Sequence, residues 1–175
     1  MITTLLATIS LNIVPMANPR IAILVENRGQ MVAELYPDAA PKTVARILEL
    51  VQAKFYDGVR FHRVDNNPKP FIVVTGDPFS KGDGALNDPK IGTGGSGKKI
   101  PFEANTVKFL NGTLGLVRDQ RDKATGGDSQ FFICNGNQSF LEGNYVAFGR
   151  VTEGLGIIQE IRLGDRITSI RELKP

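Results

Sequence analysis

Short apolar runs separated by glycine-containing turns continue along the chain from Arg20 onward, and they restrict the fold more than any other feature. The first two runs, residues 20–26 and 30–35, flank Asn27-Arg28-Gly29. Asparagine and glycine tolerate positive φ, so this spacing predicts a β-hairpin. The same pattern predicts further strands at residues 60–64, 71–75, 113–117, 130–134, 146–150 and 166–173.

Two segments have helical rather than strand periodicity. Pro41 is suited to begin a helix, and apolar residues follow Val44 at i+3, i+4 and i+7, which predicts a helix from residue 41 to about 53. A shorter helix is predicted at residues 155–162, ending before Gly164. Many short strands with two helices, in no strict alternation, argue against a parallel α/β sheet and favour a closed antiparallel barrel.

The composition restricts the classes of function. A length of 175 residues, 41% of them hydrophobic, is enough for one buried core. The net charge of +3 and the scattered basic residues argue against nucleic acid as a partner. With Cys134 as the single cysteine and His62 as the single histidine, the chain lacks the ligands of a usual zinc site. Cys134 is interpreted as a buried packing residue.

Residues 1–18 form an N-terminal extension ahead of the domain that we predict at 19–175. Residues 5–14 are mildly apolar, but 1–19 contain no lysine or arginine, so the segment lacks the positive start of a secretory leader and is too short to span a bilayer. We expect a cytoplasmic monomer without a membrane span. A loose arm or extra strand, an atypical export leader and a true start at Met16 remain open alternatives.

The segment Gly92-Thr93-Gly94-Gly95-Ser96-Gly97 has the spacing of a dinucleotide-binding loop. That motif requires a strand before it and a helix after it, whereas Asn87-Asp88-Pro89 precedes it here and Ile100-Pro101 follows. We therefore predict a backbone turn in a surface loop. The polar residues 78–91 before it are interpreted as an inserted surface loop that could shape substrate access.

Two other groups of polar residues receive the simpler interpretation. Asp119 and Asp122 alternate with basic residues in one polar loop, which is typical of a solvated charge run. A Ser-His-Asp triad would need His62, and no Gly-x-Ser-x-Gly elbow is present, which argues against hydrolysis.

Two short phrases, Phe61-His62-Arg63 and Ser129-Gln130-Phe131-Phe132-Ile133, combine hydrogen-bonding side chains with phenylalanines. Such a mixture suits a site that holds an apolar group while directing a donor at it. Together with Thr75-Gly76-Asp77-Pro78 and Tyr145-Val146-Ala147-Phe148-Gly149, they occur in the same order as in the cyclophilins. The chain resembles that family from Pro19 to its C-terminal strand.

The resemblance implies a mainly β fold, a closed eight-stranded antiparallel barrel capped by two α-helices, with a proline pocket on its outer face. It also implies a peptidyl-prolyl cis-trans isomerase that needs no cofactor and acts on proline-containing peptides or unfolded protein clients, assisting their folding. Arg63 corresponds to the family's catalytic arginine, a permanently charged group with several donors. The resemblance assigns substrate binding to His62, Phe71, Ile72, Val74, Val117, Arg118, Gln130, Phe132, Phe140, Leu141 and Tyr145.

Within this set the expected roles differ. The phenylalanines, Ile72 and Leu141 form the pocket, because aromatic faces suit an apolar pyrrolidine ring. Gln130 holds the substrate backbone, as do the main-chain groups of Val117 and Arg118, while His62 supports the site.

The sequence departs from the family at three of these positions. Val74 stands where the family usually has a glutamine that orients the arginine, Phe140 where many members have tryptophan, and Tyr145 where many have histidine. Valine has no polar atom with which to orient Arg63. The alternative function is therefore a proline-peptide binding or chaperone-like module with weak turnover.

Overall fold

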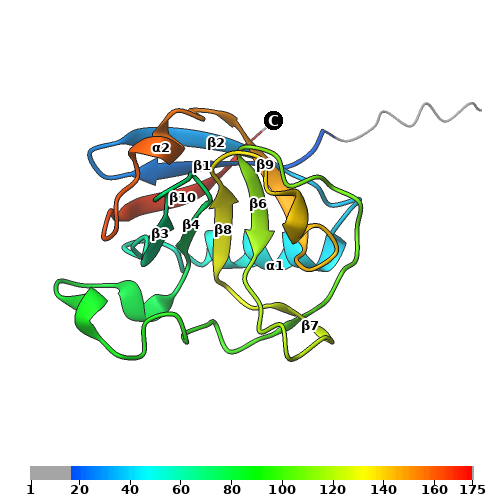
Figure 1. The fold of residues 1–175 in the computed structure, drawn as a ribbon, viewed down its shortest axis with the longest axis horizontal. Helices are drawn as coiled ribbons and strands as arrows, with labels where there is room; N and C mark the ends of the chain where they lie inside the picture. The colour runs from blue at the N-terminus through cyan, green and yellow to red at the C-terminus, as the bar shows by residue number, and fades with distance from the viewer. Residues whose placement is uncertain (1–16, 175) are drawn as a thin grey trace, which may run out of the picture.

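An eight-stranded antiparallel sheet curls on itself to form the body of the molecule, in a computed structural model that describes residues 17–174 (Figure 1). Its strands are β1 (Arg20–Val25), β2 (Gly29–Leu35), β3 (Arg63–Asp65), β4 (Ile72–Thr75), β6 (Thr113–Leu116), β8 (Phe131–Cys134), β9 (Ala147–Glu153) and β10 (Ile167–Leu173). They are ordered β10-β1-β2-β9-β6-β8-β4-β3. The mainly β, eight-stranded antiparallel fold predicted from the sequence is confirmed.

The two edge strands, β3 and β10, approach each other and bring the ends of the sheet together. A single bridge pairs Arg60 with Arg166. Beside it, the Phe61 amide donates to the carbonyl of Asp165 over 2.9 Å. The predicted strand at residues 60–64 is thus displaced to β3, because Arg60 and Phe61 pair with residues immediately before β10 before the chain joins β4.

The predicted hairpin and first helix form within a residue or two of their expected bounds. Asn27 and Gly29 adopt φ angles of 59° and 111° in the turn between β1 and β2. Helix α1 (Pro41–Gln52) begins at its proline, and the carboxylate of Glu103 accepts from the backbone amides of Lys42 and Thr43 over 2.9 and 2.8 Å. Glu103 therefore supplies the cap that no neighbouring side chain provides.

Helix α2 (Ile157–Glu160) is shorter than the predicted 155–162, because the backbone becomes extended at Ile161. Two short strands, β5 (Ile100–Pro101) and β7 (Thr125–Gly127), pair with each other and were not predicted. They contain two and three residues, with proline and glycine among them, so they lack a strand pattern.

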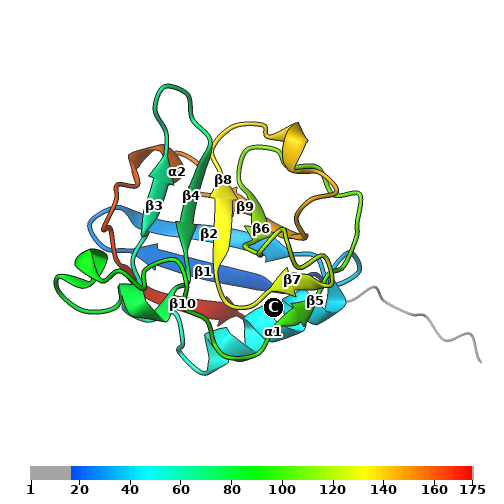
Figure 2. The same ribbon diagram turned by 60° about the horizontal axis from the view of Figure 1, so that its bottom comes forward.

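The interior of the curled sheet is apolar, and each helix packs one face against it. Helix α1 lies across the opening at the bottom of the curl (Figure 2) and buries Val44, Ile47 and Leu50. Helix α2 contributes Ile158 to the same core. Alternate side chains of β4 and β8 pack into this core. Because side chains alternate along a strand, the residues between them point to the outer face of the sheet.

Between residues 17 and 174, no helix is long and apolar enough to cross a membrane. The alternatives considered for residues 1–16, including a start at Met16, lie outside the described residues.

Candidate active site

A second apolar cluster, which we call the outer cluster, lies on the outer face of the sheet over β4, β6 and β8. The antiparallel register pairs Val74 with Phe132 and Ile72 with Cys134, so these four side chains share a face, while Val73 points into the core. The outer cluster contains Ile72, Val74, Phe109, Phe132, Cys134, Leu141 and Ala147, with Phe71, Val107, Val117 and Tyr145 partly buried against it.

The ring of Phe132 is held in the outer cluster from three sides. It stacks on Phe109 with ring centroids 5.8 Å apart and packs at nearly a right angle to the ring of Tyr145, with centroids 5.4 Å apart. Beneath it lies Gly115, where an added Cβ would come within 2.2 Å of the Phe132 Cζ atom. A glycine in a strand interior often marks such a close approach. Phe132 therefore forms a rigid floor.

The rim of this floor is an exposed aromatic side chain. Phe140 lies in a short 3-10 turn, η3 (Ser139–Leu141), with 63% of its surface exposed, and its ring centroid is 5.4 Å from that of Phe71. Leu141, the next residue, is buried in the outer cluster. A buried floor with an exposed aromatic rim can hold a flat apolar ring that arrives from solvent.

Arg63 stands at the edge of the same face. It is paired with Val74 across β3 and β4, and Val74 is paired with Phe132, so Arg63 lies two strand spacings, about 10 Å, from the floor. Its side chain is 58% exposed, and its Nη2 lies 2.5 Å from Oδ2 of Asp65. Asp65 was not among the predicted site residues, although a residue two positions along a strand shares a face with Arg63.

His62 is half-buried behind Arg63. Its backbone amide donates to the carbonyl of Val74 over 3.1 Å, and its Nδ1 has no hydrogen-bond partner among residues 17–174. Burial lowers the pKa of His62 below its ordinary 6.5, although the carboxylate of Asp77 acts in the opposite direction. The imidazole is therefore neutral at pH 7 and suits a supporting role.

Gln130 is buried beside the outer cluster and is held by the glycine-rich turn. Its Nε2 donates to the carbonyls of Gly94 and Gly92 over 2.7 and 3.1 Å. Those glycines are fixed in turn by buried Asp77, whose Oδ2 accepts from their amides over 3.2 and 2.5 Å. The predicted turn is present, and no helix follows it. The nitrogen of Gln130 therefore faces two carbonyls, which leaves Oε1 as the acceptor atom of this side chain.

A cavity of about 680 Å³ adjoins Gln130. Its walls include the glycine-rich turn, Val117, Arg118 and Phe79, the last from the inserted loop 78–91. The guanidinium of Arg118 lies 4.5 Å from the ring centroid of Phe102 and donates from Nη1 to the Thr125 carbonyl over 3.4 Å. The inserted loop thus contributes one wall of a space next to the candidate site.

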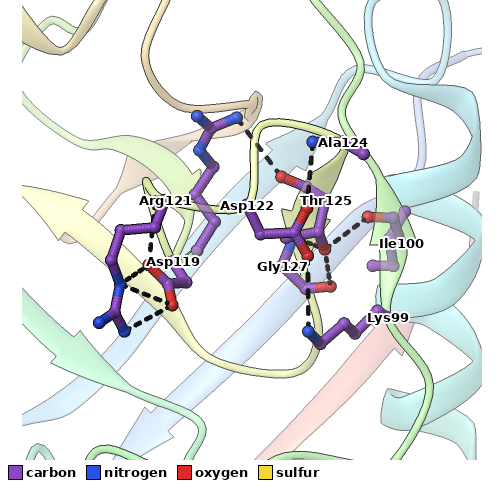
Figure 3. A network of polar contacts seen from close by, with 9 residues as sticks. Lys99, Ile100, Asp119, Arg121, Asp122, Ala124, Thr125 and Gly127 are labelled. Carbon is purple, nitrogen blue, oxygen red and sulfur yellow. Dashed lines mark hydrogen bonds and ion pairs between the residues drawn. The ribbon is translucent and has the colours of Figure 1, made fainter.

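Figure 3 shows the polar contacts of the loop that carries Asp119 and Asp122, and Asp119 and Arg121 of this loop also line the cavity. Arg121 donates to Asp119 and lowers the pKa of that carboxyl to about 2. Asp122 lies 3.6 Å from Nζ of Lys99. Both carboxylates are partly exposed and separately paired, as expected for a solvated charge run, and they do not form an acid-base dyad.

The structure brings most of the predicted site residues together. Seven of them lie in or against the outer cluster: Phe71, Ile72, Val74, Val117, Phe132, Leu141 and Tyr145. Phe140 lies at its rim, Arg63 at its edge and His62 behind Arg63, while Gln130 and Arg118 border the adjacent cavity.

Four members of the outer cluster were not predicted as site residues, namely Val107, Phe109, Cys134 and Ala147, and neither was Gly115 beneath Phe132. Phe109 has no sequence signal, whereas Gly115 carries the weak signal of a glycine inside a strand. Cys134 is fully buried, as predicted, but its side chain belongs to the outer cluster, where burial raises its pKa to about 12. Within residues 17–174 no group of histidine, cysteine or carboxylate side chains could hold a metal ion.

Comparison with known proteins agrees with this geometry. Residues 20–174 match the family model described as cyclophilin type peptidyl-prolyl cis-trans isomerase. A "Peptidyl-prolyl cis-trans isomerase" of Synechococcus elongatus is 39% identical over 152 residues, which cover 86% of this chain and 94% of the relative. "Peptidyl-prolyl cis-trans isomerase B" of Bacillus subtilis is 36% identical over 148 residues, covering 85% and 94%.

The fold is also similar to a solved structure. A cyclophilin-type isomerase from Cryptosporidium parvum superposes with a TM-score of 0.76 over 90% of this chain and 99% of its own, at 24% sequence identity. The same protein was solved in the presence of the dipeptide Ala-Pro, with a TM-score of 0.74.

Proposed function

The chain belongs to the cyclophilin-type peptidyl-prolyl cis-trans isomerases. From that premise we propose that Arg63 and the outer cluster catalyse the cis-trans isomerisation of X-Pro bonds in flexible or unfolded protein segments. One observation carries this assignment: a permanently charged arginine stands on the same sheet face as a buried aromatic floor with an exposed rim. The cavity beside Gln130 adjoins this face, so an extended peptide can run across both.

The outer cluster binds the proline ring. The pyrrolidine rests on Phe132, with Phe71, Leu141 and Phe140 around it, and removing its apolar surface from water supplies the binding free energy at about 25 cal/mol per Å². Because Phe132 is packed against Phe109 and Tyr145, the floor loses little side-chain freedom when the ring binds.

Gln130 fixes the peptide backbone beside the ring. Its amide is oriented by the glycine-rich turn, so its Oε1 accepts an N–H of the substrate without a search through rotamers. With one side of the X-Pro bond held in this way, the other side remains free to rotate.

Arg63 stabilises the twisted amide. Rotation about a peptide bond faces a barrier of about 18–20 kcal/mol, because resonance gives the C–N bond partial double-bond character. As the bond twists, the proline nitrogen becomes pyramidal and regains its lone pair, and a guanidinium N–H donates to it. That hydrogen bond is stronger in the transition state than in either planar isomer, so it accelerates rotation in both directions. No covalent bond is made or broken, and no proton has to leave His62.

NMR exchange spectroscopy on a short peptide with one X-Pro bond tests this assignment. We expect catalytic amounts of the protein to accelerate cis-trans exchange, and a saturating peptide to shift the ring resonances of Phe132 and Tyr145. A control peptide with alanine in place of proline should leave those resonances unshifted. Accelerated exchange with shifts confined to another face would show that the site is assigned wrongly.

For the clients, we propose X-Pro segments of unfolded or flexible proteins, whose folding the enzyme assists. The site lies on an outer surface with an exposed rim, so an extended chain can reach it without entering a closed cavity. Uncatalysed X-Pro isomerisation takes tens to hundreds of seconds and can limit folding. Refolding of a test protein with a proline-limited slow phase should accelerate in proportion to enzyme concentration, and an unchanged slow phase would contradict this proposal.

Val74 favours the second candidate, a binding or chaperone-like module with weak turnover. The valine side chain cannot hydrogen-bond to Arg63, and Val74 is buried, with 4% of its surface exposed. This candidate predicts that a proline peptide shifts the outer-cluster resonances while its exchange rate stays unchanged. It also predicts a large gain in rate for Val74→Gln.

A further inference from the structure

We propose that Asp65 is a positioning residue that holds the Arg63 guanidinium at the edge of the proline pocket. The proposal rests on the catalytic role of Arg63 given above. It assigns to a carboxylate on β3 the orienting task for which Val74, on β4, has no polar atom.

The geometry leaves Arg63 little other support. Among the strands of residues 17–174, β3 is the last of the sheet and pairs with β4, where Val74 faces Arg63 across the pair. Among residues 17–174, the contact of Nη2 with Oδ2 of Asp65, at 2.5 Å, is the one polar contact of the Arg63 side chain. Residues at i and i+2 of a strand share a face, so Asp65 holds the guanidinium on the face of the outer cluster.

The contact orients the guanidinium and leaves other N–H donors free for the substrate. A guanidinium has five N–H donors in a planar fork, and the nearest contact of the ion pair is made through Nη2. The donors on Nη1 and Nε remain for the substrate. A long arginine side chain loses rotamer freedom when it is ordered, and Asp65 removes part of that freedom before substrate binds.

The Asp65 carboxylate has no visible structural task. Its side chain is about one-third exposed and contacts Arg63 alone among the polar groups of residues 17–174. The β3–β4 hairpin is closed by its backbone instead, through the Phe71 amide, which donates to the Asp65 carbonyl over 2.9 Å. Substitution of the side chain therefore leaves the hairpin bonds in place.

The experiment compares Asp65→Ala and Asp65→Asn with wild type by NMR exchange rates on one X-Pro peptide. Because the pair is partly exposed, we expect kcat of Asp65→Ala to fall about two- to fivefold with KM changed less than twofold. Asp65→Asn, which keeps an acceptor oxygen without the charge, should lie between them. Glu153→Ala, which breaks the exposed pair with Arg20 outside the site, is the matched control and should leave kcat unchanged.

A second readout follows the arginine itself. ¹⁵N relaxation of the Arg63 Nε should show greater mobility in Asp65→Ala than in wild type, which a purely structural role would not produce. An unchanged or higher kcat in Asp65→Ala overturns the proposal, since Asp65 would then be idle or would restrain Arg63, and so does unchanged Arg63 mobility. These outcomes differ from a failure of the catalytic assignment, in which Arg63→Ala itself would keep the wild-type kcat.

Discussion

Replacing Gly115 with alanine tests whether Phe132 is the floor of the proline pocket. Gly115 lies in β6 directly under the Phe132 ring, and an alanine Cβ there would lie 2.2 Å from Cζ and 2.6 and 2.7 Å from the Cε atoms. Ordinary contact between carbon atoms begins at about 3.5 Å, so the ring has to move outward by roughly 1.3 Å. Because Phe109 and Tyr145 flank the ring, the open direction is toward the pocket.

The size of the effect follows from that displacement. Overpacking a well-filled cluster costs about 1–3 kcal/mol of unfolding free energy, which lowers Tm by about 2–12 °C in a domain of this size. A displacement of about 1 Å at a binding surface can cost up to about a hundredfold in kcat/KM. The floor contacts the proline ring in the planar and twisted states alike, so the loss should fall mainly on KM.

Exchange rates measured over a range of peptide concentrations, together with thermal unfolding, give both quantities. The control is Gly156→Ala, the same chemical change at an exposed position where nothing lies within 4 Å of the added Cβ. We expect Gly115→Ala to raise KM at least tenfold and Gly156→Ala to leave KM unchanged. A Gly115→Ala protein with a lowered Tm but wild-type KM would refute the role of Phe132 as the floor.

Two further predictions concern pH. Burial lowers the pKa of His62 below 6.5 and Arg63 stays charged, so kcat/KM should change less than about twofold between pH 7 and 9. A bell-shaped profile of kcat/KM in that range would contradict the supporting role of His62. Burial raises the pKa of Tyr56 above its ordinary 10, so the unfolded chain loses that proton first and stability should decline as pH rises above about 10. Tyr56→Phe removes the 3.0 Å bond to the Ser129 carbonyl and should lower Tm at pH 8 by about 2–12 °C, for a cost of about 1–3 kcal/mol. It should also lose less of its remaining stability between pH 8 and 10.5 than wild type, and equal losses would assign the alkaline decline to other groups.

Local signals were sufficient for the elements whose bounds depend on neighbouring residues. The hairpin turn at Asn27 and Gly29 and the start of α1 at Pro41 were predicted because positive φ and the proline ring act within one or two residues. The pocket residues were predicted from the resemblance, since each phenylalanine alone would be interpreted as core.

The parts that the sequence did not predict depend on contacts between distant segments. Glu103 caps a helix that begins 62 positions earlier, and Gly115 matters because Phe132 of another strand lies above it. The orientation of Gln130 by Gly92 and Gly94 depends on a fold that brings residues 36 to 38 positions apart together. The hydrophobic periodicity of a sequence does not indicate which distant residues come into contact.

The most direct measurement of the central claim is the rate of cis-trans exchange catalysed by Arg63→Ala and Arg63→Lys on one X-Pro peptide. Loss of a charged donor aimed at the transition state should lower kcat of Arg63→Ala by about 10²–10³-fold while KM changes less than about threefold. Lysine keeps the charge but not the planar fork, so Arg63→Lys should fall between alanine and wild type. An Arg63→Ala protein that folds, binds the peptide and retains the wild-type kcat would contradict the account.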